Sequence, residues 1–92
     1  MRYKDILRGN VSAADARADL CKRVKDFAYL SKKHFDSPEC FSDYTAKAVR
    51  GRIYGICARL EYLGIISKTF EDYLYEHLDR ISDKYGISYD RL

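Results

Sequence analysis

Histidines and cysteines have the widest chemical range of the residues in this chain, and their spacing limits what they could do. His34 and His77 are far apart, and Cys21, Cys40 and Cys57 form no Cys-x-x-Cys pair. Zinc sites draw on closely spaced ligands of these types, so we predict no metal site and no cofactor. A cysteine nucleophile needs an oriented base, and His34 and Cys40 are a weak candidate pair. We therefore expect no catalytic residue and a protein that is not an enzyme.

Carboxylates recur at helical spacing in the last third of the chain. Four of them stand at i, i+4, i+7 and i+11, on one face of a helix: Asp72, Glu76, Asp79 and Asp83. We call this set the acidic stripe. The ordinary interpretation is a solvated helix face. The functional one is a contact surface for a basic partner, in which carboxylates imitate a phosphate backbone.

Tyrosines support the functional interpretation of the acidic stripe. The chain has nine Tyr and no Trp. Several fall outside the aliphatic faces of their helices, namely Tyr29, Tyr54, Tyr62 and Tyr75. Tyrosine provides a large contact area and a polar tip, and it is enriched at binding surfaces. We therefore predict a partner-binding face made of the acidic stripe and Tyr75.

Basic residues gather on an earlier helix. One face carries Lys22, Lys25, Tyr29 and Lys32, with Lys33 nearby, and we call these five residues the basic face. Lysines beside an aromatic ring suit phosphate contacts and base stacking, although Asp26 interrupts the face. The alternative is a solvated helix back whose lysines complement the helix dipole. Further on, Arg52 and Arg59 are expected to lie at a rim with exposed head groups, or to bind an acidic partner.

Periodicity and capping signals predict the helices that position these residues. Three main helices are expected at about 13–35, 43–63 and 68–85, after a short N-terminal helical segment. Ser12 and Ser67 are good N-caps, and Gly9, Gly64 and Gly86 are good C-terminal residues. The short connector at residues 64–67 makes the second and third main helices antiparallel neighbours. We predict one all-α domain over residues 1–92, a compact bundle with an apolar core.

The predicted core follows the inward face of each helix. It consists of Leu20, Val24, Phe27, Phe35, Val49, Ile53, Ile56, Leu60, Leu63, Phe70, Leu74, Leu78 and Ile81.

A second line of small residues follows the middle helix. It consists of Ala48, Gly51, Gly55 and Ala58, and we call it the small-residue line. A glycine inside a helix costs about 1 kcal/mol relative to alanine, so two of them one turn apart need an explanation. Close packing against the first helix or the N-terminal segment is the favoured one. A groove for a partner helix or for a second copy is the alternative.

Charge and composition limit the function classes. The net charge is +3, too small to imply nucleic acid by itself. The basic excess lies in residues 1–62, and the acidic excess in residues 63–92. The exposed residues expected on the last helix are the acidic stripe and Glu71, which would repel DNA from a helix-turn-helix. Unpaired cysteines and the absence of a long apolar run lead us to expect a cytoplasmic protein with no membrane segment.

The chain is short and tyrosine-rich, it is predicted to be all-helical, and its basic and acidic residues lie in different regions. Its last two helices are joined by the predicted hairpin Tyr62-Leu63-Gly64-Ile65-Ile66-Ser67. In these respects it resembles small accessory proteins of phages and mobile elements, among them the anti-CRISPR proteins. The resemblance rests on no family motif and assigns no functional residue. It implies a stoichiometric inhibitor that binds a defence protein in the host cytosol.

Two functions are therefore carried forward from the sequence. The first is a non-catalytic protein-binding module, of the inhibitor kind, that uses the acidic stripe and surface tyrosines. The second is a small nucleic-acid-binding protein that uses the basic face. A homodimer is compatible with either function.

Overall fold

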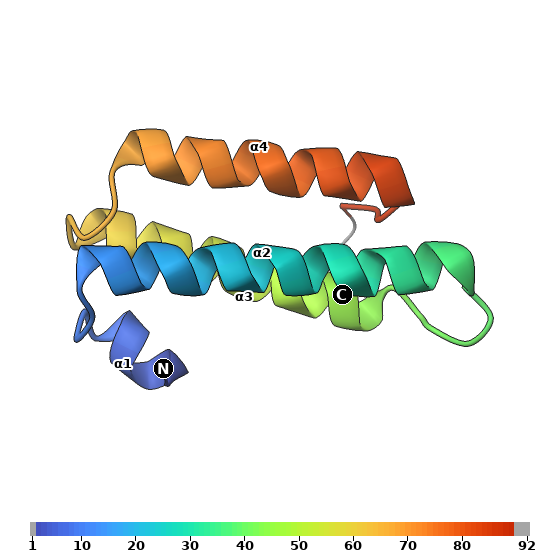
Figure 1. The fold of residues 1–92 in the computed structure, drawn as a ribbon, viewed down its shortest axis with the longest axis horizontal. Helices are drawn as coiled ribbons and strands as arrows, with labels where there is room; N and C mark the ends of the chain where they lie inside the picture. The colour runs from blue at the N-terminus through green and yellow to red at the C-terminus, as the bar shows by residue number, and fades with distance from the viewer. Residues whose placement is uncertain (1, 90–92) are drawn as a thin grey trace.

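The computed structural model describes residues 2–89, and over that range it contains helices and no strand. The elements are α1 (Tyr3–Leu7), α2 (Ala13–Asp36), α3 (Tyr44–Tyr62) and α4 (Lys68–Tyr85). In Figure 1, α2 and α4 run in the same direction. Helix α3, which follows α2 in the sequence, runs in the opposite direction and packs against both. The short α1 lies at one end and contacts α3. The predicted bundle of three main helices is confirmed.

Local signals explain where these helices begin and end. The Ser12 hydroxyl accepts a hydrogen bond from the Asp15 N–H at 3.1 Å, and the Ser67 hydroxyl accepts one from the Phe70 N–H at 3.1 Å. Each serine satisfies an N–H group that has no partner within the helix. At the other end of α4, Gly86 adopts φ +67°, a left-handed conformation that only glycine adopts at little cost.

Most of the predicted core is confirmed, and two members are wrong. Side chains of Leu20, Phe27, Ile53, Ile56, Leu60, Leu74 and Leu78 are buried, and those of Val24, Val49, Phe70 and Ile81 pack against them partly buried. Phe35, by contrast, is 59% exposed and Leu63 is 38% exposed. Phe35 lies in the last turn of α2, and its ring meets α4 only edge-on at Tyr85, the last residue of that helix, with ring centroids 5.8 Å apart. Leu63 follows α3 and lies over the backbone of Gly9.

Segments outside the main helices complete the core. Ile6 of α1, Ile66 of the connector between α3 and α4, and Ile87 after α4 are each at most 4% exposed. The Ile87 N–H donates to the Ser82 carbonyl at 2.9 Å, which turns the chain back onto the bundle after Gly86. The ends of the described chain therefore close the two ends of the bundle.

Candidate functional site

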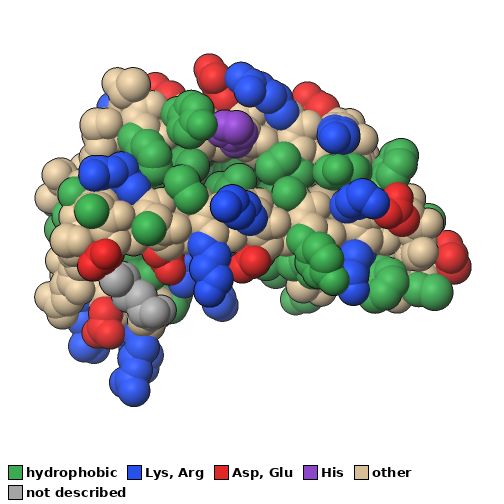
Figure 2. Space-filling model, viewed as in Figure 1, with side chains coloured by type: hydrophobic (Ala, Val, Ile, Leu, Met, Phe, Trp, Pro, Cys, Tyr) green, Lys and Arg blue, Asp and Glu red, His purple; other side chains and the backbone are tan. Residues whose placement is uncertain are grey.

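The acidic stripe lies on the outer face of α4, and all four of its carboxylates are exposed. Figure 2 shows acidic side chains along the edge of the molecule that α4 forms. Two stripe residues meet cations of the same helix: Lys68 Nζ lies 3.0 Å from Asp72 Oδ1, and Arg80 lies 3.6 Å from Glu76. The acidic stripe is therefore a row of carboxylates in which Asp72 pairs with a lysine and Glu76 with an arginine of the same helix.

Asp79 differs from its neighbours in the stripe because it has a partner outside α4. The Tyr89 hydroxyl donates to Asp79 Oδ1 at 3.1 Å, and this contact ties the segment after α4 to the stripe. Burial is the main cause that raises the pKa of Tyr89, and the hydrogen bond to Asp79 adds to it. Asp79 thus has a structural role in addition to any role in binding.

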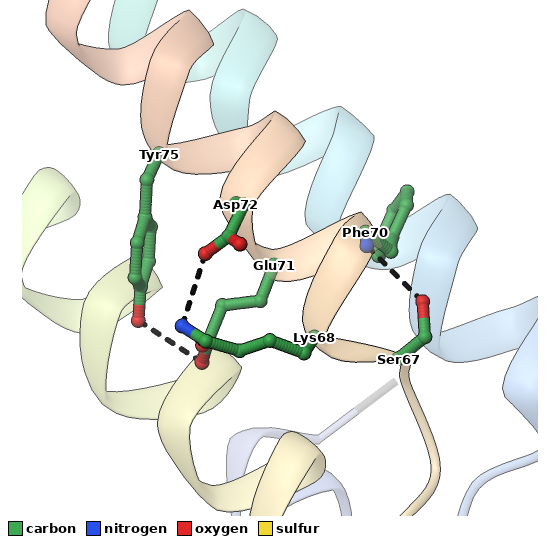
Figure 3. A network of polar contacts seen from close by, with 6 residues as sticks. All are labelled: Ser67, Lys68, Phe70, Glu71, Asp72 and Tyr75. Carbon is green, nitrogen blue, oxygen red and sulfur yellow. Dashed lines mark hydrogen bonds and ion pairs between the residues drawn. The ribbon is translucent and has the colours of Figure 1, made fainter.

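Glu71 was expected among the exposed residues of this helix, and that prediction is wrong. It is only 5% exposed and lies on the side of α4 that faces α3. Figure 3 shows its two partners: Tyr75 donates from its hydroxyl at 3.2 Å, and Lys68 lies at 3.1 Å. Glu71 stands one residue before Asp72, and a rotation of about 100° per residue moves it from the outer face toward the core.

Tyr75 belongs to this network and lies partly in the interior of the bundle. Its ring packs edge-on against Tyr54 of α3, with centroids 5.1 Å apart. Burial is the first cause of its raised pKa, followed by the charge of Glu71. Of the four tyrosines expected at surfaces, Tyr29 and Tyr62 are exposed, while Tyr54 and Tyr75 line the seam between α3 and α4. Tyr75 is therefore only partly accessible to a partner.

The basic face of α2 is exposed at Lys22, Lys25, Tyr29 and Lys32, and half-buried at Lys33. Lys33 Nζ lies 4.9 Å from the ring centroids of both Tyr29 and Phe41. Lys32 pairs with Asp36 at 2.7 Å, and this hydrogen bond raises the pKa of Lys32. The face therefore combines exposed cations with two exposed aromatic rings.

Arg52 and Arg59, expected at a rim, both contact α1. The Arg59 guanidinium donates from Nε to the carbonyl of Leu7 at 2.9 Å. The Arg52 guanidinium lies over the ring of Tyr3, 4.7 Å from its centroid. These contacts fasten α1 to α3, which is a structural reason for both arginines.

The small-residue line does not pack within the monomer, so the favoured explanation of its glycines is wrong. Gly51 and Gly55 are exposed, and a Cβ atom built on either would meet nothing within 4 Å. Ala48 and Ala58 are exposed as well. Helix α2 instead contacts α3 along the aliphatic side of α3, because the larger side chains bury more apolar surface there. The alternative of a surface for a partner or a second copy stays a prediction.

Arg50 is a buried charge that the sequence analysis did not single out. It is 5% exposed, and its guanidinium donates to Ser82 Oγ at 2.9 Å and to the carbonyl of Ser88. It also lies over the Tyr89 ring, 4.7 Å from the centroid. Its position three residues before Ile53 and seven before Cys57 was a signal, since that spacing shares the inner face of α3.

Metal-ligating side chains do not cluster in the part of the chain that the structure describes. Within residues 2–89, no group of three His, Cys, Asp or Glu could hold a metal ion. The Nδ1 atom of His34 lies 2.8 Å from the carbonyl oxygen of Phe41, a hydrogen bond that holds the loop after α2. Cys57 is buried, and burial raises the pKa of its thiol to about 12. A thiol in that state is a poor nucleophile at neutral pH.

None of the helices in the described part of the chain combines the length and the apolar character of a membrane span.

Comparison with known proteins adds no relative: no protein-family model, no curated protein and no solved structure matches this chain.

Proposed function

We propose that this chain is a non-catalytic protein-binding module whose acidic stripe contacts a basic surface of its partner. The observation that carries the proposal is the exposure of all four stripe carboxylates along one face of α4. From Asp72 to Asp83 the face extends over about 16 Å, at about 1.5 Å of rise per residue. A rigid row of negative charges of that length suits a basic channel on another protein.

Ion pairs inside the stripe are compatible with this role. The Asp72 and Glu76 side chains are 57% and 67% exposed, and their partners Lys68 and Arg80 are 66% and 71% exposed. Exposed pairs of this kind contribute about 0–1 kcal/mol, so a cation of the partner can replace them at little cost. Asp83 has no ion pair within residues 2–89 and is directly available to a partner.

The finer form of the proposal is an inhibitor of a protein that handles nucleic acid. A basic channel that normally holds phosphates would be occupied by carboxylates instead, and a one-to-one complex would block it. The resemblance in kind to the anti-CRISPR proteins supports this form.

A charge-reversal experiment tests the proposal. The stripe variant changes Asp72, Glu76 and Asp83 to Lys and leaves Asp79 intact because of its contact with Tyr89. The matched control changes Asp26, Asp36 and Glu39 to Lys, which alters the net charge equally on other exposed sites. Capture from cells of the native host, with nuclease added, should recover a protein with the parent and the control but not with the stripe variant.

The outcome also tests the inhibitor form. The captured protein should lose its nucleic-acid binding at one equivalent of the parent chain and keep it with the stripe variant. If the stripe variant retains the same protein as the parent, then the acidic stripe is an ordinary solvated surface.

A second candidate function, nucleic-acid binding by the basic face, is supported by one specific observation. Lys33 lies between two exposed aromatic rings, Tyr29 and Phe41, which could stack on bases while the lysines contact phosphates. An anisotropy titration with single-stranded DNA and RNA should then show an affinity that falls steeply with salt. The absence of binding at low salt removes this candidate.

A further inference from the structure

An apolar groove runs between α2 and α4 on the face opposite α3. Helix α2 contributes Val24, Lys25 and Ala28 to its lining, and α4 contributes Tyr73, His77 and Ile81. The groove has a volume of about 270 Å³. In Figure 2, hydrophobic side chains gather along the seam between α4 and α2, with Lys and Arg side chains on both sides. We call it the α2/α4 groove.

The other two seams of the bundle are closed or polar. Between α3 and α4, Tyr54 packs edge-on against Tyr75, and Arg50 donates to Ser82 Oγ across the seam. Between α2 and α3, the hollow is lined by charged residues, among them Arg23 and Asp26. The α2/α4 groove has a more apolar lining than the hollow between α2 and α3 or the one beside the loop after α2.

Cations stand on both sides of this groove. Lys25 and Lys32 lie seven residues apart on α2, and Arg80 and Lys84 follow His77 at i+3 and i+7 on α4. Carboxylates pair with two of these cations, Asp36 with Lys32 and Glu76 with Arg80. No ion pair within residues 2–89 involves Lys25 or Lys84, so the border of the groove carries a positive excess.

This charge pattern selects among possible occupants. A second copy that packed its own α2/α4 groove here would bring Lys25 and Lys84 close to like charges, which disfavours self-association. A helix with apolar residues at i, i+3, i+4 and i+7 would fill the groove, and acidic residues on its flanks would meet the cations. Parallel neighbours such as α2 and α4 leave a linear seam that matches the axis of a third helix.

We propose that the α2/α4 groove binds an amphipathic, acidic α-helix of a partner protein. The apolar stripe of that helix lies over Val24, Ala28 and Ile81, and its carboxylates pair with Lys25 and Lys84. Tyr73, which is 53% exposed, covers one side of the bound helix. This surface is distinct from the acidic stripe, so the two proposals stand or fall separately.

A pair of synthetic helical peptides tests the proposal. Both carry the same Leu positions and one Trp, and their flanks are Glu in one and Lys in the other. Because the protein contains no Trp, the emission of the peptide reports binding directly. The Glu peptide should bind at least about tenfold tighter than the Lys peptide, and its affinity should fall with added salt. Amide chemical shifts of the protein should change along the groove, at Ala28 and Ile81.

Two matched pairs of variants locate the site. Lys25→Glu should weaken binding of the Glu peptide at least about tenfold, whereas Lys22→Glu, exposed on the same helix but not among the residues that line the groove, should change the affinity by less than about twofold. Ala28→Gln should obstruct the groove, and Ala58→Gln, exposed on α3 and outside the groove lining, should not. Circular dichroism verifies that each variant keeps its helices. The stripe variant described above should still bind the Glu peptide.

Three results would overturn this inference. The first is equal affinity for the two peptides, which would show that charge does not select the occupant. The second is equal weakening by Lys25→Glu and Lys22→Glu, which would place the peptide outside the groove. The third is sedimentation of the parent as a dimer that Ala28→Gln dissociates, which would assign the groove to a second copy of this chain.

Discussion

At the residue scale, Arg50 shows how a permanent charge is accommodated inside a small bundle. Its guanidinium has two oxygen partners, Ser82 Oγ and the Ser88 carbonyl, and it lies over the rings of Phe27 and Tyr89. Hydrogen bonds and ring faces replace the water that burial removes. They also connect α3 to the end of α4 and to the segment after it.

Replacement of Arg50 should therefore destabilise the fold. Arg50→Ala should lower the free energy of unfolding by about 2–4 kcal/mol, because Ser82 Oγ stays buried without its donor. Arg50→Lys should also destabilise, since an ammonium cannot reach both oxygens with the same fork. Urea denaturation measures both effects. Lys22→Ala, on an exposed site, should stay within about 0.5 kcal/mol of the parent. An Arg50→Ala variant as stable as the parent would contradict this structural role.

Cys57 permits a prediction of pH dependence. Burial, and then the charge of Glu71, raises the pKa of its thiol from 9.0 to about 12. The unfolded chain loses this proton at lower pH than the folded chain does. The thiol's contribution to stability is therefore complete below pH 9 and is lost as the pH rises toward about 12. Cys57→Ala should make the decline of stability with pH less steep over that range.

Thiol labelling provides an independent check on the same residue. Cys21 and Cys40 are exposed and Cys57 is buried. A thiol reagent at pH 8 should modify the first two rapidly and the third only in denaturant. Rapid modification of all three in the folded protein would show that Cys57 is accessible.

At the scale of the elements, the glycines of α3 differ physically from those at helix ends. Gly51 and Gly55 have helical backbones and open space around them, whereas Gly64 and Gly86 have φ of +73° and +67°. Gly51→Ala and Gly55→Ala should each stabilise the protein by about 0.5–1 kcal/mol, because alanine restricts the unfolded chain more and favours the helix. Gly64→Ala and Gly86→Ala should each destabilise it, by about 1 kcal/mol.

Thermal melts of these four variants measure the difference, and light scattering detects any change in association. A lower melting temperature for Gly51→Ala, with loss of a larger species, would show that the small-residue line is an interface between copies. The stabilising result would leave those glycines without a packing role in the free chain.

At the scale of the whole molecule, a 92-residue chain has little stability to lose. Domains of this size are stable by about 5–14 kcal/mol in total. The bundle therefore depends on its short segments as well as on its main helices, and Ile87 is the most buried of the described residues after α4. Its neighbour Ser88 accepts a hydrogen bond from Arg50, which joins this segment to α3.

Shortening the Ile87 side chain should therefore destabilise the protein strongly. Ile87→Ala should cost about 2–4 kcal/mol and lower the melting temperature by about 10 °C or more. Leu63→Ala is the matched comparison, since Leu63 is 38% exposed and should cost clearly less. Calorimetry of the two variants measures both values. Equal losses would mean that the segment after α4 contributes no more than an exposed leucine does.

The sequence by itself determined the helices and the surface charge of this protein. Caps such as Ser12 and Ser67 act on their own helix, and the 3.6-residue period indicates the inward direction of each helix whatever its neighbours are. The exposure of the acidic stripe followed from the same period. These features could be predicted because the interactions behind them join residues only a few positions apart.

Only the tertiary structure decided which residues at the border of each inward face are buried and which pair of helices has an open groove between them. Arg50 and Glu71 are buried because α4 and the described segment after it lie against α3. Spacing places Arg50 on the inner face of α3, but only packing provides the oxygens of Ser82 and Ser88 that accept its hydrogen bonds. Phe35 continues the inward face of α2 but is largely exposed, since it lies beside Tyr85, where α4 ends. The α2/α4 groove likewise stays open because Ile6 of α1 and Ile87 after α4 are buried in other parts of the bundle. In each case burial depends on residues far away in the sequence, whose positions relative to one another arise only when the helices pack.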